Sequence, residues 1–151
     1  LNRVYRSRQV EGVFQEPELL PRQVNCGTNR FNVFVSPDES YAIVPAAGME
    51  DAFDGVDYYA VFRDENDRWS EPVNMGREVN QDNARGWSPY VSPGGKFFFF
   101  MATRTREFEP QEWNYQNLKE LYVSPGNGNA DIYWMSAGFL ESLRTEAVFY
   151  P

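Results

Sequence analysis

The sequence predicts an all-β protein built from four-stranded antiparallel meanders, the arrangement of β-propeller blades. Two observations support this fold class. Short stretches rich in aromatic and β-branched residues alternate with clusters of Asp, Asn, Gly, Pro and Ser, which is typical of strands joined by tight turns. The same strands and turns also recur along the chain, and self-similar units made of strands are characteristic of propellers.

The clearest strands and turns lie between Asp57 and Met101. Residues 57–63 and 69–73 flank the turn formers 64–67, which predicts a first hairpin. Residues 86–91 and 96–102 flank a Ser-Pro-Gly-Gly turn, which predicts a second. The run from Phe97 to Met101 is apolar throughout, so we expect it to be covered on both sides.

The repeat is visible in three pairs of segments. Val33–Val44 overlays Tyr90–Phe100, with a Ser-Pro turn and an apolar strand in both. Arg22-Gln-Val-Asn25 overlays Arg77-Glu-Val-Asn80 at a shift of about 55 residues, just above the usual repeat range. Asp131–Met135 overlays Asp57–Val61. We therefore expect a half blade over 1–30, a blade over 31–73, and a blade over 87–151 with an insertion at 103–129.

Smaller elements fill in these units. Glu11-Gly12 predicts the turn of an N-terminal hairpin, and Asn114 is expected to cap a short helix over 115–122. A closing helical turn is expected at Phe139–Leu143, followed by a final strand over 147–150. Two and a half blades are fewer than the four of a closed propeller, which favours completion by a missing N-terminal part or by a second chain.

The motifs resemble a known repeat family. The turns at Ser36-Pro37-Asp38 and Ser92-Pro93-Gly94-Gly95, the Trp-Ser-Glu-Pro strand at 69–72 and the run at 126–134 resemble the WD40-like propeller repeat of TolB-type proteins. The resemblance covers most of 31–144 and the C-terminal part of such a propeller. It implies a periplasmic or secreted setting in a bacterium and a binding or scaffolding role toward a protein or glycan.

Composition excludes several functions. The formal net charge is −8, which argues against nucleic acid as the main partner, because phosphate binding needs clustered Lys and Arg. The chain contains no His, so these residues provide neither a Ser-His-Asp triad nor a His-ligated metal site. Cys26 is the single cysteine, so no internal disulfide forms. No apolar run has the length of a membrane span, so no membrane insertion is expected.

Strand order predicts where binding residues gather. In a meander the short turns share one edge of the sheets, so the longer segments 45–56, 74–86 and 103–129 should share the opposite edge. Binding sites concentrate on long loops held by a rigid scaffold. The binding residues expected on this long-loop face are Asp54, Arg85, Trp87, Arg104, Trp113 and Tyr115. The strand aromatics Tyr58, Tyr59, Trp69, Tyr133 and Trp134 are expected to pack within the blades.

The leading hypothesis is a non-catalytic binding propeller without a cofactor, and the sequence leaves alternatives to it. A glycoside hydrolase would need a carboxylate pair, for which Asp51, Asp54, Glu107 and Glu109 are candidates. The acidic loop Glu50–Asp57 has the oxygen ligands of a calcium site, although its spacing differs from an EF-hand. The chain could instead be the accessory propeller of a larger peptidase.

Overall fold

The computed structural model describes residues 2–53, 55–81, 86–107 and 112–150, which form a mostly β protein with two helices. All strand pairs described are antiparallel. The elements in chain order are β1 (Tyr5–Arg6), β2 (Gln9–Val10), β3 (Val13–Phe14), β4 (Glu18–Leu19), β5 (Asn29–Arg30), β6 (Phe34–Val35), β7 (Tyr41–Ala47), β8 (Val56–Phe62), β9 (Val73–Asn74), β10 (Tyr90–Val91), β11 (Phe97–Thr105), α1 (Tyr115–Val123), β12 (Asn127–Ser136) and α2 (Phe139–Glu146).

The central sheet has the order β5-β7-β8-β9, and β6 also pairs with β7. The predicted meander is therefore present, but its first strand is split into two short pieces. Pro45 explains the split. Its carbonyl accepts from the Phe31 N–H at 3.0 Å, so its nitrogen, which lacks a hydrogen, faces the same edge. The edge strand is interrupted at that point, and β7 continues through Pro45 to Ala47 where a loop was expected.

The fourth strand of this sheet is shorter than predicted. Residues 69–73 were expected to pair along their length, whereas β9 consists of Val73 and Asn74. Trp69 makes only an isolated bridge with Arg63. The Ser70 N–H still donates to the Phe62 carbonyl at 2.7 Å, so the segment follows the sheet edge with irregular pairing.

The C-terminal sheet, β10-β11-β12, repeats the central sheet residue by residue. Ala46 pairs with Asp57 in the central sheet, and Ala102 pairs with Asp131 at the corresponding position. Because an antiparallel register fixes which side chains share a face, each residue of β6, β7 and β8 has a positional counterpart in β10, β11 or β12. The insertion is shorter than predicted, since β11 extends to Thr105 and β12 begins at Asn127.

The Ser-Pro turns are equivalent in detail. The Ser36 N–H donates to the Tyr41 carbonyl, and the Tyr41 N–H donates to Ser36 Oγ at 3.1 Å. Ser92 and Phe97 make the same two bonds, the second also at 3.1 Å. Each turn places one residue at positive φ, Glu39 at 55° and Gly95 at 67°. The turn role predicted for both motifs is confirmed.

The N-terminal unit repeats the third and fourth strands. The Tyr5–Leu19 pair of β1 and β4 corresponds to the Tyr59–Asn74 pair of β8 and β9. Between these strands, β2 and β3 form the predicted hairpin, with Glu11 and Gly12 at positive φ in its turn. The described sheets do not close into a ring.

Two cores hold the three units together. One face of the central sheet, with Ala42, Val44 and Ala46, packs on Leu20 and Val24 of the N-terminal unit. The opposite face packs on the C-terminal sheet, and its core residues include Ile43, Tyr58, Ala60, Met75, Val79, Phe98, Phe100 and Ala102. Because both faces of β7 and β8 are covered, these strands contain the most deeply buried residues of the chain.

The prediction that Phe97–Met101 is covered on both sides is wrong for one face. Phe98 and Phe100 are buried, whereas Phe97, on the other side of the strand, is 42% exposed. Trp134 of β12 shares this outer face and is 64% exposed, so its predicted packing within a blade is also wrong. The apolar run gives β11 two apolar faces, both suited to packing against another sheet. Only the inner face has a partner among the described residues.

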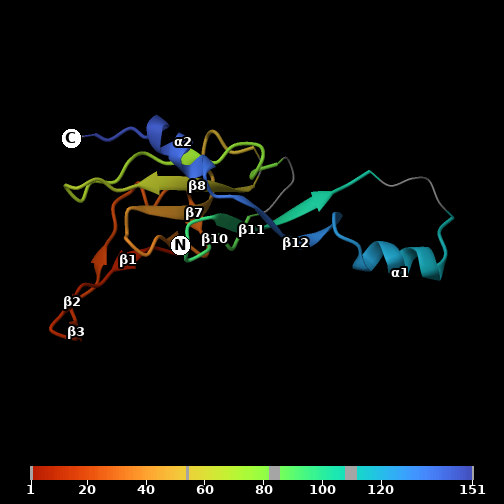
Figure 1. Ribbon diagram of the computed structural model, residues 1–151, viewed down its shortest axis with the longest axis horizontal. Helices are drawn as coiled ribbons and strands as arrows, with labels where there is room; N and C mark the ends of the chain where they lie inside the picture. Colours follow the sequence, from red (N-terminus) through yellow and green to blue (C-terminus); the bar gives the residue numbers. More distant parts are fainter. Residues whose placement is uncertain (1, 54, 82–85, 108–111, 151) are drawn as a thin grey trace.

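Both helices lie near their predicted positions. Asn114 caps α1, as expected, by accepting from the Asn117 N–H at 2.9 Å, but no residue of α1 is buried. Figure 1 shows α1 at one end of the long axis, away from the sheets, and the β2–β3 hairpin near the other end. α2 lies over β8 and buries Leu140. None of the described helices is long and apolar enough to cross a membrane.

The predicted final strand over 147–150 is absent. The C-terminal segment instead follows α2, and the Val148 carbonyl accepts a single bond from the Glu71 N–H at 2.8 Å. The residues after β12 form α2, which covers the inner core. The edge of β12 consequently has no fourth strand among the described residues.

An ionic cluster ties the N-terminal unit to the central sheet. Arg6 donates to both carboxylate oxygens of Asp67, at 3.0 and 2.9 Å, and Arg63 Nε donates to Oδ1 at 2.6 Å. The Arg6 guanidinium, followed in effect by Arg63, lowers the pKa of Asp67 to about 2. The cluster is partly exposed, with 35% of the Asp67 side chain accessible.

Replacing Asp67 with Asn is expected to lower the free energy of unfolding at pH 7 by about 1 kcal/mol. The folded pKa lies below the unfolded value of about 3.9, so the stabilisation is present above pH 4 and lost as pH falls from about 4 to 2. In urea titrations, the difference in free energy of unfolding between the variant and the wild type should disappear as pH falls through this range. Glu65→Gln, at an exposed position in the same turn, is the control. A gap independent of pH would contradict the assignment.

Candidate functional site

The described parts of the long connections lie at one end of the sheets. Tyr58 is the third residue of β8, after the β7–β8 connection, and its hydroxyl donates to the Met101 carbonyl in β11 at 2.7 Å. Arg104, further along β11 toward α1, donates through Nη2 to the carbonyl of Glu78 in the β9–β10 connection at 2.7 Å. The Thr28 N–H, in the β4–β5 connection, donates to the Ala47 carbonyl at the end of β7. These contacts place the connections together at what we call the long-loop end.

The β4–β5 connection is held by a buried arginine. Arg30 is 5% exposed, and its Nη1 donates to the carbonyls of Asn25, Cys26 and Gly27 at 3.0–3.1 Å. Its Nε and Nη2 donate to the Asn2 carbonyl. Gly27 has a φ of 65°, and a Cβ at this position would collide with the Ala47 carbonyl oxygen. The connection therefore wraps around one guanidinium.

Asn25 fixes the same connection to the N-terminal unit. It accepts from the Val4 N–H at 2.9 Å and donates to the Val4 carbonyl at 3.1 Å. Asn80 makes the same pair of bonds with Tyr58, at 2.8 and 3.0 Å. This shared geometry explains why Arg-x-Val-Asn recurs in the sequence: the Val is buried, and the Asn supplies the bond to a backbone N–H whose own carbonyl also accepts from a neighbouring backbone N–H.

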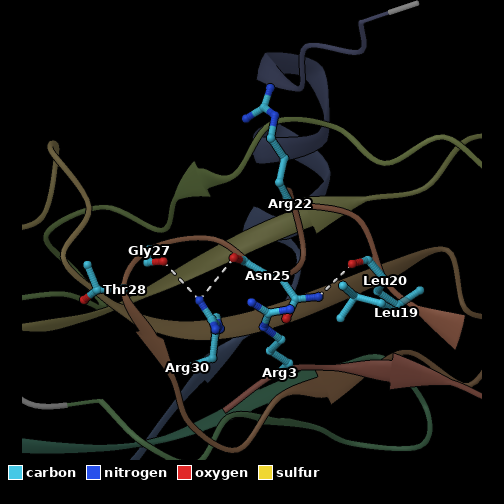
Figure 2. Close-up of a pocket in the computed structure, with 8 residues that line it drawn as sticks. All are labelled: Arg3, Leu19, Leu20, Arg22, Asn25, Gly27, Thr28 and Arg30. Carbon is cyan, nitrogen blue, oxygen red and sulfur yellow. Dashed lines mark hydrogen bonds between the residues drawn. The ribbon is translucent and has the colours of Figure 1, made fainter. Parts of the chain in front are cut away.

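A cavity of about 660 Å³ is lined by residues of the segment before β1, of β4, of β5 and of the β4–β5 connection. Its lining contains three guanidinium groups, two leucines and no carboxylate among the residues described. In Figure 2 the side chains of Arg3 and Arg30 extend toward Asn25, whereas Arg22 extends away from them. The lining residues are Arg3, Leu19, Leu20, Arg22, Asn25, Gly27, Thr28 and Arg30.

The charges of the three arginines are compensated to different degrees. Arg22 forms a two-point ion pair with Glu71, at 2.9 and 2.5 Å. Arg30 bonds only to carbonyls in the described structure, so its buried positive charge has no carboxylate partner there. Arg3 is exposed and has no partner among the described residues. A protein of net charge −8 thus concentrates positive charge at one cavity.

An acidic cavity adjoins the basic one. It has a volume of about 540 Å³, shares Gly27 and Thr28 with its neighbour, and is lined by Glu50, Asp51 and Glu71. The two cavities therefore present opposite charges on either side of a single stretch of backbone. A ligand that spans both would need an acidic and a basic group side by side.

The residues predicted to bind are not brought together at this cavity. Trp87 is 41% exposed and stacks on Phe31 at 5.9 Å between centroids. Arg104 lies over the Tyr133 ring at 4.3 Å and bonds to Glu78. Trp113 precedes α1 and Tyr115 is its first residue, and they are 64% and 79% exposed. Arg85 and Asp54 lie outside the described residues.

Two of the acidic candidates, Asp51 and Asp57, are engaged with protein groups. Asp51 Oδ1 accepts from the Tyr59 hydroxyl at 3.0 Å. Asp57 is buried, and its Oδ2 accepts from the Phe53 N–H and from Asn74 Nδ2 at 2.8 and 3.0 Å. Among the residues described, no three His, Cys, Asp or Glu side chains converge as metal ligands would. Glu107 is exposed, and Glu109 lies outside the described residues.

Sequence reasoning missed the basic cavity, although the repeat contained a signal for it. Extending the overlay of Arg22–Asn25 on Arg77–Asn80 by five residues aligns Arg30 with Arg85. The extended overlay gives an arginine at the same sequence position of both repeats. No sequence pattern indicated Arg3, whose position depends on the pairing of β1 with β4.

Fold and cavity together define a mostly β protein of repeated antiparallel units with a basic cavity at its long-loop end. Comparisons with protein-family models, curated proteins and solved structures find no match to this chain.

Proposed function

We propose that this protein is a non-catalytic binding module of propeller-type blades, which recognises an acidic group of a protein or glycan partner at its long-loop end. The blade assignment is supported by the residue-by-residue register shared by the units and by their face-to-face stacking. On the resemblance of its motifs to TolB-type repeats, we extend the proposal to a periplasmic or secreted setting.

The basic cavity is the observation that carries this proposal. Guanidinium groups bind carboxylates, sulfates and phosphates through parallel N–H donors, and Arg3 has these donors free of any described partner. The side chain of Arg30 stays in its buried position, and its uncompensated positive charge adds electrostatic attraction for an anion. Leu19 and Leu20 supply apolar contact beside the charge. This combination suits the binding and orientation of an anionic group.

The adjoining acidic cavity favours a protein over a glycan. Polypeptides carry acidic and basic side chains within a few residues, whereas acidic glycans carry one sign of charge along their length. A peptide could therefore place an acidic side chain near Arg3 and a basic one near Glu50 and Asp51. We expect peptides with both charges to bind more tightly than those with acidic residues alone.

Arg3→Glu is expected to weaken binding of a short Asp-rich peptide at least about tenfold, or ~1.4 kcal/mol, because it replaces attraction with repulsion at the cavity. Titration calorimetry should compare this peptide with its Asn counterpart, with a mixed Asp/Lys peptide, and with an oligogalacturonate. Lys119→Glu makes the same charge change in α1, and Lys119 is also exposed. Equal weakening by both variants would mean that only net charge matters, and equal binding of the Asp and Asn peptides would refute the proposal.

A further inference from the structure

The C-terminal sheet presents an apolar outer face with no partner among the described residues. Register pairs Phe99 with Trp134 and Met101 with Ile132 on this face. Ile132 is 79% exposed and Trp134 is 64% exposed. The outer face also includes Tyr90 and Phe97, and none of these side chains is a carboxylate, ammonium or guanidinium. Their exposed surface is on the order of 500 Å², similar to the largest patches found on ordinary monomers.

The internal repeat shows what such a face packs against. The counterparts of Phe99, Ile132 and Trp134 in the central sheet are Ile43, Tyr58 and Ala60. Those three residues are buried against the next sheet along the chain. The outer face of the C-terminal sheet therefore corresponds to the face by which one unit packs on the next. α2 does not occupy it, because Leu140 packs in the inner core.

The complementary type of face is open at the other end of the molecule. In the central sheet, Tyr59 faces the preceding unit and is buried there. Its counterpart in the N-terminal unit is Tyr5, which is 54% exposed, and the cross-strand neighbour Leu19 is 47% exposed. The exposed Val10 and Val13 lie on the adjoining β2–β3 hairpin. No described segment covers Tyr5.

We propose that a second copy of this chain stacks head to tail, with the outer face of its N-terminal unit on the outer face of the C-terminal sheet. Within one copy, the central sheet stacks on its neighbours. The proposed contact between two copies has the same kind of stacking. It is heterologous, so each copy uses two different surfaces and the assembly extends to a ring or a short filament. The proposal rests on the two outer faces and not on the basic cavity.

Self-association should appear as a weight-average mass that rises above 17.5 kDa with concentration over about two decades in sedimentation equilibrium. Trp134→Arg should abolish the rise, because it places a charge at the centre of one face. Trp113→Arg is the matched control, since Trp113 has the same 64% exposure but lies beside α1. Ile132→Lys tests the same face independently of any effect of Trp134→Arg on folding.

The head-to-tail geometry predicts a complementation that a symmetric dimer cannot show. Tyr5→Arg should also leave the protein monomeric, because it blocks the second face. Mixing Tyr5→Arg with Trp134→Arg should restore one-to-one dimers, because one intact face of each kind remains in the mixture. Three results would each overturn the proposal: a wild type that stays monomeric, a Tyr5→Arg variant that still associates, or a mixture without dimers. Binding of acidic peptides is measured separately through Arg3, so failure of one proposal leaves the other distinguishable.

Discussion

Phe98→Ala is expected to lower the free energy of unfolding by about 4 kcal/mol, the largest effect of any single substitution proposed for this chain. Phe98 is fully buried between the central and C-terminal sheets. Its ring stacks on Phe100 at 5.1 Å and meets Tyr58 edge-on at 6.2 Å and Phe139 at 5.8 Å. Truncation removes these contacts and leaves a cavity that three rings from different elements cannot easily fill.

Phe97→Ala provides the matched control for Phe98→Ala. The two residues are neighbours on β11 and have the same side chain, but Phe97 points to the outer face and is 42% exposed. We expect a loss of only about 1 kcal/mol for Phe97→Ala. Urea titrations should be run at concentrations where the protein is monomeric, since association would add its own stabilisation. Similar losses for the two variants would show that the assigned inner and outer faces of β11 are wrong.

Asn80→Ala is expected to lower the free energy of unfolding by about 3 kcal/mol. The Asn80 side chain is 3% exposed, accepts from the Tyr58 N–H at 2.8 Å and donates to the Tyr58 carbonyl at 3.0 Å. This carbonyl also accepts from the Met75 N–H, whereas Asn80 supplies the bond to the Tyr58 N–H. Asn80 also donates to Asn74 Oδ1 at 2.9 Å. Alanine cannot replace these bonds, so the Tyr58 N–H would remain buried and unsatisfied, and the Tyr58 carbonyl would keep only its bond from the Met75 N–H.

Asn25→Ala tests whether burial sets the size of this effect. Asn25 makes the same two bonds, with Val4, but it is only half-buried, so water can reach the groups that the substitution frees. We expect a loss of about 1–2 kcal/mol. Thermal and urea unfolding of the two variants side by side would measure the difference. An equal loss at both positions would indicate that the bonds themselves, and not their burial, determine the cost.

Much of the fold followed from local patterns. The Ser-Pro turns, the Glu11-Gly12 turn and the Asn114 cap depend on the conformational preferences of a few consecutive residues, and each was found where predicted. Most of the predicted antiparallel strand pairs were also found, with different lengths, but the final strand over 147–150 was not. β7 continues through Pro45, contrary to the prediction, because the neighbouring edge strand is interrupted where Pro45 lacks an N–H. This interruption is a property of the partner strand, which local patterns do not show.

The candidate site was less accessible to prediction. Trp87 and Arg104 were selected because their residue types suit ligands, but the structure engages them with Phe31 and Glu78. Arg30 was overlooked because its one signal is the alignment with Arg85 in the extended repeat, and no local pattern indicates that it is buried. Its burial arises from the closure of the β4–β5 connection around it, which involves Asn2, a residue 28 positions earlier.

The sequence by itself determined the repeated unit, because turn residues and alternating apolar positions act within a few residues of one another. Only the tertiary structure decided which faces are covered, since Phe97 and Phe98 are chemically identical and differ solely in what stacks against them. The same holds for the basic cavity, whose three arginines come from separate segments of the chain and line one cavity only in the folded protein. Stacking is a long-range interaction between whole sheets, so the sequence of a single strand does not indicate which sheet packs against it.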